Sequence, residues 1–508
     1  MVNCTRLESV SRKAPRVRIL SPPRFALSYN LFMPFFELLV ASCKKYKIYI
    51  AFLILTFIFV FPLFYVHYPS LMDDGIDITL TKQAKSYLDL FINELVGGSR
   101  TRPLRLIYRK VLFDLFDIDL AYHFLVQSSV LWLIVSLVFK LIKEITRKKN
   151  LAILGGLLVF LLPATVGNFY RLGTTEHLQV LVLLLTLIAI RYNWWLAFCL
   201  ALINCFIKET SLFFFLIPLI NAVVYQKNKH WMIATNLFTL TMIAGFYYYK
   251  MVIADDLYVN QAKLNIANIT QLIPYSGPNL IILVLATIYF ALNFVKKKTI
   301  PKTEFMILIS AFCSLLPAFI WDMQLAYYQY PLQIFTLILF FTWINKQNKI
   351  KKSKKKHFLT VIISIALFLT CKVWFFNSKD ILIEHYERHL AEAALVSFIL
   401  NNNWTNYHVY LGHVGSNNFE TNLEISGYFT EWHTYPPLAF YPNMEKWANI
   451  SFLDEKSLNK LTDESIATFI KDDYPKKILL QKTEDDHQGN ICGFSPFVGR
   501  ICQYQTIE

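Results

Sequence analysis

Long apolar runs, separated by short basic clusters, are the feature that most restricts how this chain can fold. A helix that crosses a bilayer needs about 20 predominantly apolar residues. About eleven apolar segments of roughly this kind lie between Ile48 and Phe376. Of all residues, 55% are hydrophobic and only 17% are charged, fewer than in soluble domains. We therefore expect an α-helical multi-pass membrane protein. The segments are residues 48–65, 121–142, 151–166, 178–190, 194–207, 211–225, 231–252, 280–295, 305–321, 325–344 and 358–376.

The net charge of +15 would suit a nucleic-acid-binding protein, but the lysines lie in clusters between the apolar segments. Such clusters indicate the cytoplasmic side of a membrane. If the first segment runs from inside to outside, the clusters at residues 143–149, 227–229, 296–302 and 346–356 all fall inside. One long helix over residues 178–206 would place every later cluster outside, so we predict two short helices there. The N-terminus is then inside and the C-terminus outside.

Three parts are expected along the chain. Residues 1–46 form a cytoplasmic tail, and residues 47–376 form the membrane domain. Residues 16–24 resemble the translated end of a transfer-RNA gene, so we expect the native start at Met33 and residues 1–32 to be foreign; the alternative is a disordered tail. Residues 377–508 are predicted to form a small extracytoplasmic α/β domain, in which a Cys492–Cys502 disulfide is favoured over two free thiols.

Asp73 and Asp74 follow the first apolar segment almost at once. Two adjacent carboxylates at the exit of a membrane helix are unfavourable neighbours for lipid, and intramembrane or bordering charges are often functional. The alternative is that the pair only marks the boundary with water.

The outer loop that carries this pair, residues 67–120, is too long for a simple connection. Apolar residues recur at helical spacing, first at Leu80, Ala84, Leu88, Phe91 and Leu95, then at Leu104, Ile107, Val111 and Leu115. Pro103 suits the first turn of the second helix. We predict two helices that lie in the membrane interface rather than across it.

Arg102, Arg105 and Arg109 share one face of the second loop helix. Three guanidinium groups on one face suit a phosphate ligand. Anionic lipid headgroups are the alternative partners.

Two further charged pairs fall on the same predicted side of the membrane, Glu176-His177 and Lys208-Glu209. Lys208 and Glu209 interrupt an apolar stretch, where an unpaired charge is unfavourable. They either neutralise each other or belong to a broken helix that lines a cavity.

This order of features resembles the C-type (GT-C) superfamily of membrane glycosyltransferases, and the chain is similar to bacterial members related to protein O-mannosyltransferases and lipid A aminoarabinose transferases. The features are a first membrane helix, Asp73-Asp74 at the start of a long outer loop, interfacial helices and a C-terminal outer domain. The turn at residues 206–210 looks like a lysine-containing turn of bacterial members. One departure is that residues 324–331 carry tyrosines before Pro331 but lack an adjacent arginine.

The resemblance implies transfer of a sugar, with inversion, from a polyprenyl-phosphate or polyprenyl-diphosphate donor to a lipid, glycan or protein acceptor. Asp73 is expected to act as the base and Asp74 to orient it or bind a metal. A free Asp has a pKa of ~3.9, and burial beside a second carboxylate is expected to raise it. The donor phosphate is assigned to Lys208 and the three arginines. Glu176, His177 and Glu209 would bind the acceptor or a divalent cation such as Mg²⁺ or Mn²⁺.

Three other functions compete with this one. A flippase or transporter of lipid-linked glycan would need charges within its central helices. A glycan polymerase or ligase of another membrane fold would depend on outer arginines and histidines and would not need the Asp pair. A structural scaffold would explain none of the convergent charges.

The predicted orientation is testable by cysteine labelling from outside. A membrane-impermeant reagent should modify a cysteine introduced near Glu484 and leave one near Lys352 unmodified, because the two positions are expected on opposite sides. The reverse labelling pattern would overturn the helix count.

Overall fold

The computed structural model describes most of the helical part of the chain and five short strands. The described residues are 29–66, 84–96, 102–116, 119–226, 229–253, 266–297, 301–320, 325–347, 368–383, 385, 408–411, 450–452, 477–482, 492–495 and 499–507. The chain divides into two compact units, Met1–Ile50 and Ala51–Glu508. The helix packing lies within the larger unit. Asp73 and Asp74 lie outside the described residues.

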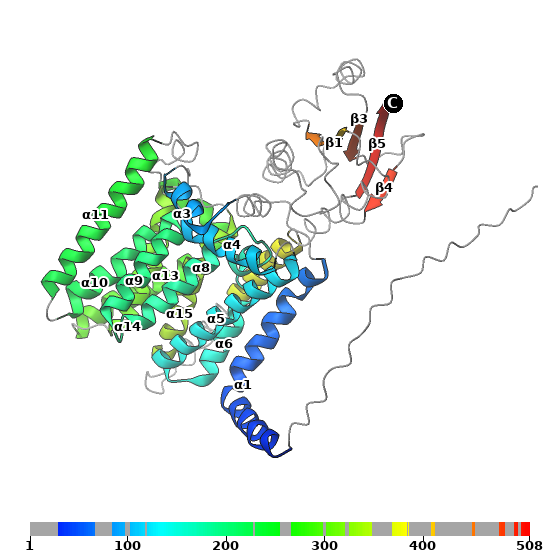
Figure 1. Ribbon diagram of the computed structural model, residues 1–508. Coiled ribbons are helices and arrows are strands. Elements are labelled where there is room, and N and C mark those ends of the chain that lie inside the picture. The colour runs from blue at the N-terminus through cyan, green and yellow to red at the C-terminus, as the bar shows by residue number, and fades with distance from the viewer. Residues whose placement is uncertain are drawn as a thin grey trace, which may run out of the picture. The chain divides into compact units, whose positions relative to one another are not determined.

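Helices dominate the described part of the chain (Figure 1). The helices that contain all or part of a predicted apolar segment are α1 (Tyr29–Val66), α5 (Leu120–Thr146), α6 (Lys149–Val159), α7 (Pro163–Phe169), α8 (Glu176–Ala189), α9 (Trp194–Ile207), α10 (Leu216–Tyr225), α11 (Lys229–Ile253), α13 (Ile273–Lys297), α14 (Lys302–Cys313) and α15 (Tyr330–Gln347). The 3₁₀ helices are η1 (Glu209–Phe215), η2 (Ile266–Leu272), η3 (Leu316–Phe319) and η4 (Ala326–Gln329).

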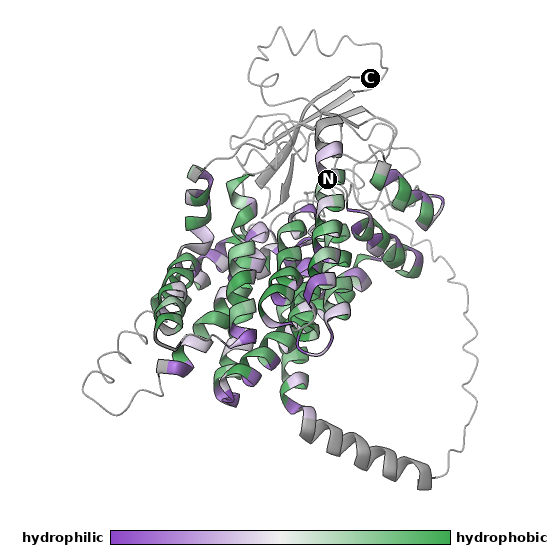
Figure 2. Cartoon of the chain, turned by 90° about the vertical axis from the view of Figure 1, so that its left-hand side faces the viewer, coloured by the Kyte–Doolittle hydropathy of each residue, from purple (hydrophilic) through white to green (hydrophobic). Residues whose placement is uncertain are grey.

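Several of these helices suit a membrane environment. Among the described residues, four spans are long and apolar enough to cross a bilayer, or five if one bent pair counts as a single span. Three shorter apolar helices accompany them. Hydrophobic residues cover most of the helical bundle, and hydrophilic residues gather toward the helix ends (Figure 2). The larger number of about eleven spans stays a prediction.

The segment at residues 151–166, expected to be one helix, is broken. The structure ends α6 at Val159 and begins α7 at Pro163, with a bend of 55° between them. Proline has no N–H and its fixed φ suits the first helical position, so it starts α7 rather than continuing α6. The side chain of Gln333 on α15 accepts a hydrogen bond of 3.0 Å from the Ala164 N–H. The break is therefore supported by a polar contact from a distant helix.

The predicted split within residues 178–206 is present. The helix α8 ends at Ala189, and α9 begins at Trp194. Asn193 caps α9, because its side-chain oxygen accepts a hydrogen bond of 2.8 Å from the Trp195 N–H. The two helices pack against each other as neighbours.

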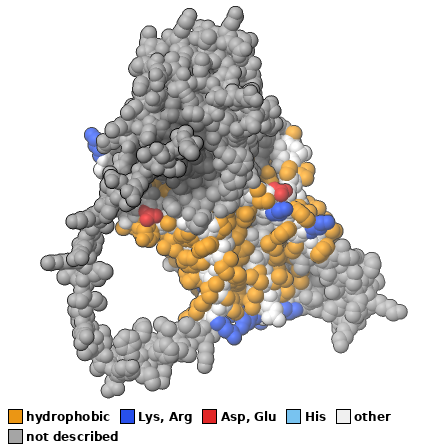
Figure 3. All heavy atoms as spheres, turned by 90° about the vertical axis from the view of Figure 1, so that its right-hand side faces the viewer, with side chains coloured by type: hydrophobic (Ala, Val, Ile, Leu, Met, Phe, Trp, Pro, Cys, Tyr) orange, Lys and Arg blue, Asp and Glu red, His pale blue; other side chains and the backbone are white. Residues whose placement is uncertain are grey.

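Charged residues tie several helix ends together at one end of the bundle. Arg191, after α8, pairs with Glu144 near the end of α5. Lys302, at the start of α14, donates a hydrogen bond of 3.0 Å to the Ile190 carbonyl. Lys346, near the end of α15, pairs with Glu304 on α14. Lysines and arginines line the lower edge of the apolar surface in Figure 3. We call this the basic end; its assignment to the cytoplasm stays a prediction.

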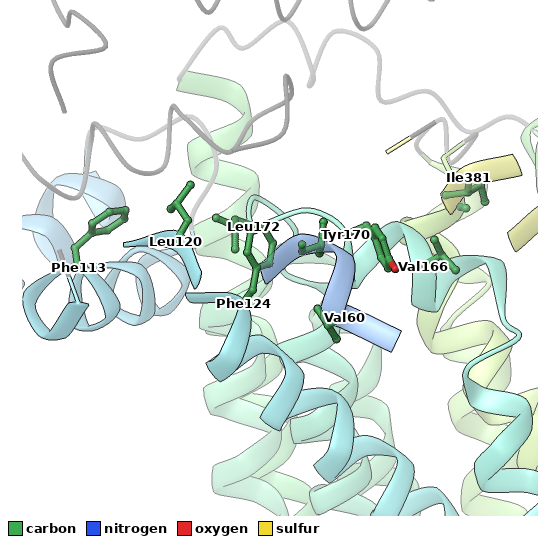
Figure 4. Close-up of a cluster of buried hydrophobic side chains, with 10 residues drawn as sticks. Val60, Phe113, Leu120, Phe124, Val166, Tyr170, Leu172 and Ile381 are labelled. Atoms are coloured by element: carbon green, nitrogen blue, oxygen red, sulfur yellow. The ribbon is translucent and has the colours of Figure 1, made fainter. Parts of the chain in front are cut away.

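A hydrophobic cluster joins helices at the other end of the bundle (Figure 4). Val60 and Leu63 of α1 pack there with Phe124 of α5, and Tyr170 after α7 donates a hydrogen bond of 2.6 Å to the Phe59 carbonyl. Ile381, in the helix at residues 368–383, belongs to the same cluster. The end of α1 is therefore fixed against α5 and the turn after α7.

The loop helices are α3 (Tyr87–Val96) and α4 (Pro103–Phe116). Pro103 opens α4 as predicted, but α3 begins later than the expected position near Ala84, and Leu80 lies outside the described residues. The expected apolar stripe of α4 is not its buried face. Val111 and Leu115 are exposed, whereas Pro103, Leu106, Arg109, Leu112 and Phe113 are buried.

The described strands are β1 (His408–Leu411), β2 (Ile450–Phe452), β3 (Lys477–Lys482), β4 (Cys492–Ser495) and β5 (Gly499–Ile507). They form one sheet of order β2-β1-β3-β5-β4. The pairs β1–β2 and β1–β3 are parallel, and β3–β5 and β4–β5 are antiparallel. Cys492 lies opposite Cys502 in the β4–β5 register. The disulfide and the α/β domain itself stay predictions.

Two glycines give a matched test of helix packing. A Cβ on Gly156 of α6 would lie 2.6 Å from Cζ of Phe52 on α1, whereas one on Gly245 of α11 would meet nothing within 4 Å. We expect Gly156→Ala to lower the free energy of unfolding in detergent by about 1–3 kcal/mol through overpacking. Gly245→Ala should leave it unchanged or raise it by up to ~1 kcal/mol. Equal effects of the two substitutions would contradict this packing of α6 on α1.

Candidate functional site

The candidate site lies where four parts of the chain meet, at the ends of α8 and α9 remote from the basic end. These parts are α4, the turn between α7 and α8, the junction of α9 with η1, and η4. The helix α8 begins in the site at Glu176 and ends beside Arg191. The helix α9 returns from Trp194 to Lys208. The start of α8 and the end of α9 therefore bring Glu176 and Lys208 together in the site.

Lys208 breaks the path from α9 to η1 with an extended backbone, at φ −154° and ψ 136°. Side chains of consecutive residues leave an extended backbone in opposite directions. Lys208 pairs with Glu176 at the start of α8, and both side chains are only 2% exposed. Glu209 pairs instead with Arg102 at the start of α4. Of the two alternatives for this pair, the structure does not favour simple mutual neutralisation, because each residue has an ion-pair partner from another segment.

The Arg102–Glu209 pair is bidentate. The Nε atom of Arg102 lies 2.6 Å from one carboxylate oxygen of Glu209, and an Nη atom donates to the other. Burial alone would lower the pKa of Arg102, but the Glu209 charge outweighs it and raises the pKa above its usual range. The backbone N–H of Arg102 also donates to Glu94 of α3 over 3.2 Å. One arginine thus connects α3, α4 and η1.

The other two predicted arginines lie on the same helix. Arg109 is 2% exposed, and its guanidinium carbon lies 5.5 Å from the centroid of the Tyr108 ring. Arg105 is half-buried, and both cations lie close enough to act electrostatically on His177. Arg102 and Arg109 therefore face the interior of the protein in this structure, which does not fit contact with lipid headgroups.

Arg171 and the tyrosines of η4 were not predicted to take part. Arg171 is 1% exposed, and its guanidinium carbon lies 4.7 Å from the centroid of the Tyr327 ring. The Nζ atom of Lys208 lies 4.6 Å from the Tyr328 ring, and the two tyrosine rings are 4.2 Å apart. The turn after α7 thus places a cation beside Tyr327 of η4. A single arginine at a helix end gave no sequence signal for this role.

Gly167 allows this approach of η4. A Cβ on this α7 residue would lie 3.3 Å from the backbone nitrogen of Tyr327. The side-chain amide of Asn168 donates to the Tyr327 carbonyl over 3.1 Å. Close backbone contact and one hydrogen bond therefore hold the tyrosines beside Arg171.

Among the described residues, cationic side chains outnumber carboxylates in this cluster. The cationic residues are Arg102, Arg105, Arg109, Arg171 and Lys208, and the described carboxylates in contact with them are Glu94, Glu176 and Glu209. Such an excess favours an anionic ligand.

The metal role expected for Glu176, His177 and Glu209 stays a prediction. Glu176 and Glu209 each accept from a cationic side chain. No group of three potential ligands among His, Cys, Asp and Glu occurs in the part of the chain that the structure describes. A divalent cation would also meet repulsion from the surrounding arginines. A cation held by Asp73 and Asp74 stays a prediction.

Comparison with known proteins adds no relative: no family model matches the chain, and no curated protein matches it. Functional inference therefore depends on the chemistry of the site itself.

Pairing of Lys208 with Glu176 rather than with Glu209 is testable by paired substitutions. Lys208→Met leaves Glu176 buried without its partner and should lower the free energy of unfolding by about 3–5 kcal/mol. Adding Glu176→Gln should recover most of the lost free energy of unfolding, whereas adding Glu209→Gln should not. Denaturant unfolding in detergent would measure all three variants. Full recovery with Glu209→Gln would instead support a Lys208–Glu209 pair.

Proposed function

We propose that the chain is an integral membrane glycosyltransferase of the C-type (GT-C) kind. It transfers a sugar from a polyprenyl-phosphate or polyprenyl-diphosphate donor to an acceptor at the outer face of a prokaryotic plasma membrane. The observation that carries this proposal is the buried, predominantly cationic cluster of α4, the α7–α8 turn and the α9–η1 junction.

The cluster suits a leaving phosphate. When the glycosidic bond to the donor breaks, negative charge develops on the phosphate oxygen. Fixed cations in a site with little water stabilise that charge without reorganising. Arg105, Arg109 and Arg171 provide such cations, and Arg102 and Lys208 are held in place by carboxylates. Because Glu176 holds Lys208, we assign that lysine to a buried pair at the edge of the phosphate site.

Asp73 is assigned as the base that removes the proton of the acceptor hydroxyl, with Asp74 beside it. The pair comes after α1 in the sequence, and the last turns of α1 pack in the same hydrophobic cluster as Phe113 of α4. Tyr170, whose hydroxyl is bonded to α1, is the neighbour of Arg171. The packing thus links the helix before Asp73 to two elements that carry the cations.

Transport is a weaker explanation of this arrangement. A transporter needs ionisable groups along a path through the membrane domain. The site and the basic end instead lie at opposite ends of α8 and α9. A polymerase or ligase without the Asp pair remains the competing enzyme, and a substitution at Asp73 separates the two.

Asp73→Asn should lower transfer from a lipid-linked sugar donor by at least 10²-fold, since loss of a general base costs roughly 10²–10⁴-fold. Asp114→Asn is a matched control in the same outer loop. Its carboxylate is exposed and accepts from Tyr87 and Lys110 on the surface, so transfer should stay near the native rate. Purified variants of equal thermal stability should be compared. Normal turnover by Asp73→Asn would exclude Asp73 as the base and favour the competing enzyme class.

A further inference from the structure

His177 has a hydrogen-bonding arrangement that fixes its proton. It lies in the first turn of α8 and is 0% exposed. Its Nδ1 atom lies 3.3 Å from the hydroxyl oxygen of Thr174. That hydroxyl donates to the Asn168 carbonyl over the shorter distance of 2.9 Å. A carbonyl only accepts, so the single Thr174 proton points to Asn168 and the Thr174 oxygen accepts from Nδ1–H.

The other ring nitrogen, Nε2, therefore carries a lone pair in the neutral imidazole. Burial and the charges of Arg105 and Arg109 disfavour a second proton there. Within the described residues, Nε2 is buried and has no hydrogen-bond partner. The histidine thus presents one acceptor to a ligand.

Tyr108 presents a second polar group beside it. Its ring centroid lies 6.4 Å from that of His177, and its hydroxyl is buried without a hydrogen-bond partner among the described residues. Burial raises the pKa of Tyr108, although the Arg109 charge acts in the opposite direction. The phenol therefore keeps its proton. An unsatisfied buried polar group costs about 1–3 kcal/mol, so two of them side by side indicate a partner beyond the described residues.

The hydrogen-bonding chemistry of His177 and Tyr108 favours a hydroxyl group as the ligand. A phosphate oxygen accepts but does not donate, so it would not satisfy Nε2. A cationic ligand would meet the nearby arginines. An alcohol donates to Nε2 and accepts from the phenol. A sugar joined directly to a phosphate would bring its hydroxyls near Arg105 and Arg109.

We propose that His177 and Tyr108 form a subsite for a hydroxyl group of the sugar carried by the donor. This subsite rests on the proposed function, because it takes the neighbouring cations as the donor-phosphate site. It gives Tyr108 a ligand-contacting role and limits His177 to hydrogen bonding through Nε2.

Binding of defined lipids tests this subsite. The probes are decaprenyl phosphate and its glucose, mannose and arabinose esters, titrated into the full-length protein in detergent. At least one ester should bind the native protein more tightly than decaprenyl phosphate. Tyr108→Phe and His177→Asn should each reduce that preference by roughly fivefold, the effect of one net hydrogen bond. Their affinity for decaprenyl phosphate itself should not change.

His177→Gln is the matched control, because its amide reaches the position of Nε2, whereas that of Asn reaches only the position of Nδ1. The sugar preference should therefore persist in His177→Gln. Tyr108→Phe should unfold at the native temperature or above, since its hydroxyl has no partner within the described protein.

The outcomes separate the two proposals. If decaprenyl phosphate does not bind the native protein, the subsite and the polyprenyl-phosphate form of the proposed function both fall. If it binds but no sugar ester is preferred, the subsite alone is overturned. The subsite is also overturned if His177→Asn and Tyr108→Phe keep the native preference.

Discussion

The arrangement of the site depends on two ion pairs that leave one turn in opposite directions. Lys208 and Glu209 are adjacent, yet Lys208 reaches Glu176 on α8 and Glu209 reaches Arg102 at the start of α4. Removing one partner of a buried ion pair strongly destabilises the protein, because the other charge stays buried alone. The turn therefore fixes the loop helix and the membrane helices relative to each other. The Arg102–Glu209 pair thus adds a charged contact to the apolar packing that holds α4 against α5 and α9.

Packing and polar contacts support the same geometry from the other side. Pro163 separates α6 from α7, Gln333 accepts the freed Ala164 N–H, and Gly167 lets the backbone of Tyr327 approach. These residues come from distant parts of the sequence. Together they turn the short segment around Arg171 toward η4 rather than toward lipid. The cation–aromatic contact at Tyr327 is thus a consequence of a broken helix.

Local composition was sufficient to predict the elements that depend on neighbouring residues alone. Apolar length and lysine clusters predicted helices and the split between α8 and α9, and Pro103 predicted the start of α4. Three features could not be predicted in this way, because they depend on contacts between remote segments. The partners of Lys208 and Glu209 come from α8 and α4, and Arg171 meets a tyrosine of η4. The buried residues of α4 were not predicted. Its apolar stripe includes the exposed Val111 and Leu115, whereas Arg109 is buried, the inverse of the arrangement in a water-soluble amphipathic helix.

That inversion explains how a short amphipathic helix can carry buried arginines. In a soluble protein, the apolar face of α4 would pack inward and its cations would face water. In the structure Val111 and Leu115 are exposed and Arg109 is buried, which is the arrangement expected of a helix whose apolar face contacts lipid. Burial of Arg109 would be costly in an apolar core, but here the interior contains carboxylates, aromatic rings and His177. A bilayer along the exposed apolar face would thus allow the face of α4 that carries Arg109 to belong to a site inside the protein.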